Sequence, residues 1–143
     1  MNRDVVMLAI KDLKEIISII ESKAVIKKSD NVKLEKELNS FLSNFSSYKI
    51  RNIKGHSQFL SGFQYAFNLM KHNKKVVTVK RLKKGGVCFP ISFPLVIPCN
   101  EIYWIDAKNI VYKEKFENQY DNYLKNLSNK RIIETLEKLE KVI

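Results

Sequence analysis

The spacing of the apolar residues changes along this chain, and that change limits the fold more than any other feature. At both ends the apolar residues recur every three or four positions, as on one face of an amphipathic helix. In the middle, residues 76–79 form a β-branched run, Val-Val-Thr-Val, which is typical of a strand. The sequence therefore predicts an α+β protein with N-terminal helices, a small antiparallel sheet and C-terminal helices.

The helical pattern predicts five helices. We expect them at residues 4–28, 31–45, about four turns from Ser57, 114–127 and 129–143. The apolar rows of the first and last helices are typical of packing inside one monomer. They leave open a homodimer through the two terminal helices.

The central part of the chain predicts a sheet of three or four strands, at about residues 75–112. The candidate strands are residues 76–79, a proline-interrupted segment at 87–97, 101–105 and 109–112. A hairpin is expected at the paired glycines Gly85-Gly86, and a second one around 106–109. With 143 residues, few glycines and few prolines, the chain predicts a single domain at 1–143.

Charge is distributed very unevenly. Between Glu37 and Glu101 there is no acidic residue, although this stretch holds ten of the basic ones: Lys49, Arg51, Lys54, Lys71, Lys74, Lys75, Lys80, Arg81, Lys83 and Lys84. The formal net charge of the whole chain is +11. A concentration of one sign of charge favours a polyanionic partner, and DNA or RNA is the first expectation.

The predicted nucleic-acid contacts are the basic hairpin and the adjacent helix end. The main candidates are Lys80, Arg81, Lys83 and Lys84, and the secondary ones are Lys74, Lys75, Arg51 and Lys54. Lysine outnumbers arginine in this segment, and lysine suits phosphates better than base edges. We therefore expect binding through phosphates with modest sequence preference, with DNA and RNA both open.

Composition also indicates the setting. Two cysteines, Cys88 and Cys99, are too few to argue for an oxidising compartment, and no apolar run is long enough to span a bilayer. A soluble cytoplasmic protein without a membrane partner is expected. There is no phosphate-binding glycine loop and no His or Cys in metal-ligand spacing, so we expect no metal and no cofactor.

Two alternative functions remain open. One is a regulator or inhibitor from a mobile element, or from a virus, whose basic face docks on an acidic protein surface. The other is a nuclease. The segment Ile105-Asp106-Ala107-Lys108 resembles the core of the PD-(D/E)xK nuclease family, which implies a divalent metal held by Asp106 and a water positioned by Lys108. The second metal-binding acid of that family has no counterpart in residues 38–100. A metal-independent ribonuclease would instead use His56, Tyr65, Lys80 and Arg81. The balance favours a binding protein over an enzyme.

Overall fold

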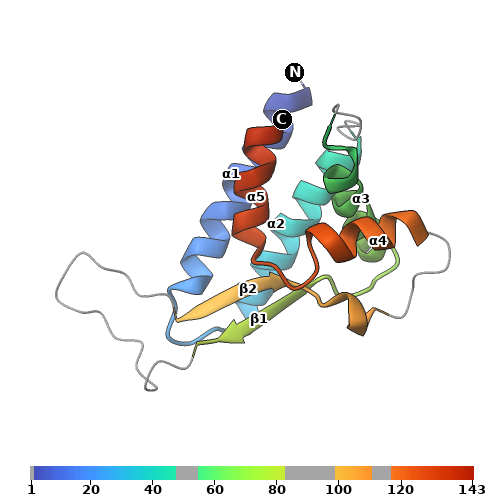
Figure 1. Ribbon diagram of the computed structural model, residues 1–143. Coiled ribbons are helices and arrows are strands. Elements are labelled where there is room, and N and C mark those ends of the chain that lie inside the picture. Colours follow the sequence, from blue (N-terminus) through green and yellow to red (C-terminus); the bar gives the residue numbers. More distant parts are fainter. Residues whose placement is uncertain (1, 48–54, 83–98, 111–116) are drawn as a thin grey trace.

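The protein has an α+β fold with helices on both sides of the sheet in chain order, as predicted (Figure 1). The computed structural model describes residues 2–47, 55–82, 99–110 and 117–143. The elements in order are α1 (Asn2–Glu21), α2 (Lys28–Ser47), α3 (Ser57–Lys71), β1 (Val77–Arg81), β2 (Asn100–Trp104), the 3-10 turn η1 (Ala107–Asn109), α4 (Glu117–Asn126) and α5 (Ile132–Val142).

Helix α1 is shorter than the predicted 4–28. It ends at Glu21, where the side-chain amide of Asn100 donates to the backbone oxygen of Ile20 in the last turn (3.2 Å) and to that of Lys23, just beyond the helix (2.8 Å). A helix ends where its last carbonyls find other donors. The apolar spacing of residues 22–28 predicts a longer helix. It does not reveal the contact with Asn100, which is distant in the sequence.

Helix α2 begins at a capping arrangement. The Asp30 carboxylate accepts from the backbone N–H of Lys27 (2.8 Å) and from the ammonium of Lys23 (2.6 Å). The first bond satisfies a donor that the helix itself leaves free. Hydrogen bonds from Lys23 and from the Lys27 backbone hold the pKa of Asp30 below its usual value.

The core is aromatic at its centre. The ring of Phe63 on α3 packs against Phe41 and Phe45 of α2, against Phe59, and against Trp104 of β2, with centroid separations of 5.2 to 5.8 Å. Phe41, Phe45, Phe63 and Trp104 are completely buried. Phe59 and Phe63, which are four residues apart on α3, therefore belong to the core, as apolar residues at helical spacing usually do.

The described part of the chain contains two strands rather than the three or four expected. β1 pairs with β2 in antiparallel register, with Val77 opposite Trp104 and Arg81 opposite Asn100. The hairpin predicted around 106–109 is the 3-10 turn η1, because the Asp106 carboxylate accepts from the backbone N–H of Lys108 (3.0 Å). The candidate strand at 87–97, Gly85-Gly86 and residues 111–112 lie outside the described residues.

The terminal helices lie side by side (Figure 1). Lys14 of α1 pairs with Glu140 of α5 (2.8 Å), and the guanidinium of Arg3 donates to the backbone oxygen of Ile143. The apolar rows of both helices are buried within one molecule: Val6, Ile10, Leu13, Ile17 and Ile20 on α1, and Ile132, Leu136 and Leu139 on α5. None of the described helices has the length and hydropathy needed to cross a bilayer.

Candidate nucleic-acid interface

Four of the eight predicted contact residues lie in described segments, and all four are exposed. Lys74 and Lys75 follow the C-terminal end of α3, and Lys80 and Arg81 are the last two residues of β1. The two pairs are therefore at opposite ends of one strand, about 16 Å apart at the usual rise per residue. The other four lie outside the described residues: Arg51, Lys54, Lys83 and Lys84.

Lys80 lies along the outer face of the sheet. Its ammonium donates to the side-chain oxygen of Asn129 (3.0 Å) and sits 4.2 Å from the centroid of the Tyr103 ring. Tyr103 is on the neighbouring strand, and a cation above an aromatic face is attracted by the ring's quadrupole. These contacts position the charge while the residue remains exposed.

Arg81 has a structural contact that its sequence position did not predict. Its guanidinium donates to the backbone oxygen of Ala24, just beyond α1, and lies 3.5 Å from the side-chain oxygen of Asn100. A guanidinium has five N–H donors, so these contacts leave others for a phosphate. Arg81 thus ties β1 to the end of α1 and still presents positive charge.

The carboxylates of the described chain do not neutralise the mid-chain cations. Within the described segments every ion pair uses a cation from the flanks, namely Lys14, Lys23 or Arg131. Five mid-chain cations are described, and each lacks a carboxylate partner there: Lys71, Lys74, Lys75, Lys80 and Arg81.

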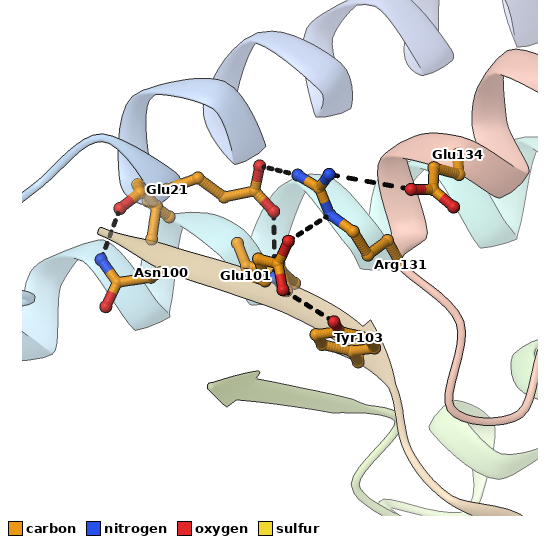
Figure 2. Close-up of polar contacts among 8 residues, drawn as sticks. Glu21, Asn100, Glu101, Tyr103, Arg131 and Glu134 are labelled. Atoms are coloured by element: carbon orange, nitrogen blue, oxygen red, sulfur yellow. Dashed lines mark hydrogen bonds and ion pairs between the residues drawn. The ribbon is translucent and has the colours of Figure 1, made fainter. Parts of the chain in front are cut away.

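The clearest example is Glu101, which stands directly opposite Lys80 in the strand register. Its carboxylate accepts from the hydroxyl of Tyr103 (2.7 Å) and lies 3.6 Å from the guanidinium of Arg131 (Figure 2). The bond to Glu101 raises the pKa of the Tyr103 hydroxyl. The Glu101 carboxylate is thus engaged by Tyr103 and Arg131, and Lys80 forms no ion pair with the described residues.

Arg131 contacts three carboxylates on the side of β2 that faces away from β1. Its guanidinium pairs with the buried carboxylate of Glu21 (2.7 Å) and lies 3.7 Å from that of Glu134 (Figure 2). The second oxygen of Glu21 accepts from the backbone N–H of Ile102 (3.0 Å). One carboxylate therefore joins the end of α1, the middle of β2 and the start of α5.

Two lysines from the C-terminal part extend the positive surface. Lys80 bonds Asn129, and the next residue, Lys130, is exposed and donates to the backbone oxygen of Lys125, which is also exposed. The turn that carries them is closed by Asn129, which has a positive φ of 59°. The sequence does not single out Lys125 and Lys130, because they lie in a segment with balanced charge. The sequence signal for this turn is Asn129 near the end of a helix, because asparagine adopts a positive φ more readily than most residues.

The residues of the nuclease interpretation do not form a metal site in the described chain. Asp106 caps η1, and Glu101 is held by Tyr103 and Arg131. Among the residues that the structure describes, no three His, Cys, Asp or Glu side chains are grouped so as to hold a metal ion. Asp106 and Lys108 therefore belong to a turn whose hydrogen bond explains their spacing.

The residues of the metal-independent alternative are not brought together either. His56 is the N-cap of α3, whereas Lys80 and Arg81 are the last two residues of β1. Tyr65 is completely buried, and this burial raises the pKa of its hydroxyl to about 12. A buried phenol with that pKa is a poor acid or base near neutral pH.

Comparison of the chain with protein-family models, with curated proteins and with solved structures finds no match.

Proposed function

We propose that this protein binds DNA or RNA, mainly through phosphates, with the basic surface that runs from the end of α3 along β1. A single observation carries the proposal: the described mid-chain cations are exposed and form no ion pair within the described segments, where the carboxylates that form ion pairs do so with Lys14, Lys23 and Arg131. Unpaired cations release the counterions condensed on a polyanion, which favours binding. Such a partner fits a cytoplasmic location.

The composition of the surface supports readout of phosphates rather than bases. Most described cations of this surface are lysines, whose ammonium groups act as point charges. These lysines are Lys74, Lys75, Lys80, Lys125 and Lys130. The arginine at this surface, Arg81, already bonds the backbone of Ala24. Affinity is therefore expected to depend strongly on salt and weakly on base sequence.

The test is a salt titration of binding to labelled duplex and single-stranded oligonucleotides. The variant replaces Lys80, Lys83 and Lys84 by Gln and keeps Arg81, because Arg81 holds the end of α1. A matched control replaces three exposed lysines of α1 and α5, Lys11, Lys138 and Lys141, by Gln. Both variants lose the same net charge.

The slope of log affinity against log salt changes by about 0.9 per lost duplex contact and by about 0.7 per lost single-strand contact. We expect the first variant to lose about two to three contacts and the control to keep the parent slope. Equal slopes in the two variants would assign the effect to net charge alone. A parent protein without measurable affinity at low salt would overturn the proposal.

A further inference from the structure

Within the part of the chain that the structure describes, the sheet has one open edge. The bonds from Leu82 N–H to the Cys99 oxygen (3.0 Å) and from Ile105 N–H to the Val76 oxygen (2.9 Å) fix the alternation of β1. In an antiparallel pair, every second residue directs its backbone groups toward the partner strand. Residues 76, 78, 80 and 82 therefore face β2, and the backbone groups of Val77 and Val79 face away from it.

These outward groups have no hydrogen-bond partner among the described residues. The opposite edge of the sheet is different. On β2 the N–H of Ile102 donates to the Glu21 carboxylate and the N–H of Trp104 donates to the backbone oxygen of Lys130 (3.0 Å). Among the described residues, the edge of β2 is closed and that of β1 is open, so a further strand can add beside β1.

A groove runs beside the open edge. One hollow of about 300 Å³ lies between Val77–Val79 of the strand and Asn31, Leu34 and Glu35 of α2. A second, of about 410 Å³, shares Glu35, Lys75 and Val77 with the first and extends to Asn39 and Lys74. Asn31, Glu35 and Asn39 are spaced by four, so they form one polar row along α2 that faces the strand edge across the groove.

We propose that this groove binds an extended acidic segment of a partner protein, which pairs with β1 as an additional strand. Main-chain bonds to Val77 and Val79 supply the pairing, as in other cases of strand addition. Lys74 and Lys75 line the groove and favour a negatively charged segment. Against these two cations, the described lining contains one acidic residue, Glu35. An extended segment with acidic residues near these lysines complements that lining.

Charge also argues against a second copy of this chain at the edge. Self-pairing of β1 would place Lys74, Lys75, Lys80 and Arg81 of both copies in one two-stranded ribbon. Like charges on facing strands destabilise the pair. The inference shares Lys74 and Lys75 with the nucleic-acid proposal but differs in its main contact, because strand addition uses the backbone edge of β1, whereas the phosphate surface uses the side chain of Lys80 on the outer face.

The test uses synthetic peptides of about eight residues and NMR hydrogen exchange of the full chain. The probe alternates Glu and Val, and the reversed-charge probe alternates Lys and Val. The Glu–Val peptide is expected to slow exchange of the Val77 and Val79 amides at least tenfold and to change Thr78 and Lys80 much less, because the latter are already paired with β2. The Lys–Val peptide is expected to leave all four unchanged.

The variant is Val79→Pro, which removes the outward N–H of an edge position where proline is tolerated. The control, Val79→Ala, shortens the side chain and keeps the N–H. We expect at least a tenfold loss of peptide affinity for Val79→Pro and less than about a threefold loss for Val79→Ala. Equal affinities, or uniform protection of residues 77–80, would overturn strand addition even if both variants still bind oligonucleotides with the parent salt slope.

Two further outcomes would reassign the groove and overturn the peptide proposal. If a single-stranded oligonucleotide protects Val77 and Val79 in the same alternating way, the groove binds nucleic acid. If the two amides become protected without peptide as protein concentration rises, the edge pairs with a second copy.

Discussion

At the level of single residues, Glu21 and Arg131 hold distant parts of the chain together. The Glu21 carboxylate is 5% exposed and bonds both Arg131 and the backbone of Ile102 (Figure 2). Arg131 is 110 positions away in the sequence and also approaches Glu101 and Glu134. A buried carboxylate is tolerated only when it is paired and hydrogen-bonded, so each residue depends on the other.

The first prediction at this scale is that Arg131→Gln is more harmful than its exposure suggests. We expect the free energy of unfolding to fall by about 2 kcal/mol, because the change leaves the Glu21 carboxylate buried without its cation. For the double variant Arg131→Gln, Glu21→Gln, we expect a loss of unfolding free energy about 1 kcal/mol smaller than the sum of the losses of the two single variants. Urea unfolding of the parent, both single variants and the double variant measures this, and additive costs would contradict it.

At the level of elements, the helices and the first strand were predictable because their signals are local. Four-residue spacing of Phe59, Phe63 and Phe67 predicts α3, and the β-branched run predicts β1. The end of α1 and the turn η1 were not predictable in this way. Each depends on a side chain that acts as a cap, Asn100 in the first case and Asp106 in the second.

Gly62 lies where α3 packs closely against the end of α4. A Cβ at this position of α3 would lie 2.9 Å from Cδ1 of the buried Leu127 and 3.4 Å from the backbone oxygen of Asn122. Gly62→Val is therefore expected to lower the free energy of unfolding by about 2 to 3 kcal/mol, through overpacking between α3 and the region of α4. Thermal unfolding measures the loss.

The control for Gly62→Val is Ser61→Val, on the same helix at a partly exposed position. Serine and valine have similar helix propensities and glycine has a lower one, so propensity favours Gly62→Val, and a larger loss at Gly62 than at Ser61 reports packing. We expect Ser61→Val to change the free energy of unfolding by less than about 1 kcal/mol. Similar losses at the two positions would contradict close packing of α3 against α4.

At the level of the whole molecule, the segregation of charge is the dominant property. A net charge of +11, with exposed lysines along β1 and at the end of α3, opposes compaction through self-repulsion. Salt should therefore stabilise this protein. The flank ion pairs, such as Lys14–Glu140, oppose this trend only weakly, because partly exposed pairs contribute little.

We expect the melting temperature to rise by several degrees when ionic strength increases from about 0.01 M to about 0.15 M, which shortens the Debye length from about 30 Å to about 8 Å. The variant Lys74→Gln, Lys75→Gln should show a smaller rise, since it removes two of the mutually repelling charges. Calorimetry of both proteins measures the difference. A melting temperature that falls with salt would show that ion pairs outweigh repulsion.

The candidate site was predictable in part. Lys74, Lys75, Lys80 and Arg81 are exposed, as a stretch without nearby acids implies. The contribution of Lys130 was not predictable, because it reaches Lys80 through the turn at Asn129. The structural contact between Arg81 and Ala24 was missed for the same reason, since 57 positions separate the two residues.

By itself, the sequence determined the periodic elements and the excess of positive charge in the middle of the chain, because apolar spacing and charge counts are properties of neighbouring residues. The tertiary structure alone decided which charges are neutralised. It joined Glu21 and Glu101 to Arg131, and it closed the edge of β2 with Glu21 and Lys130, whereas the edge of β1 has no partner among the described residues. These outcomes depend on contacts between residues far apart in the chain, which only folding brings within bonding distance.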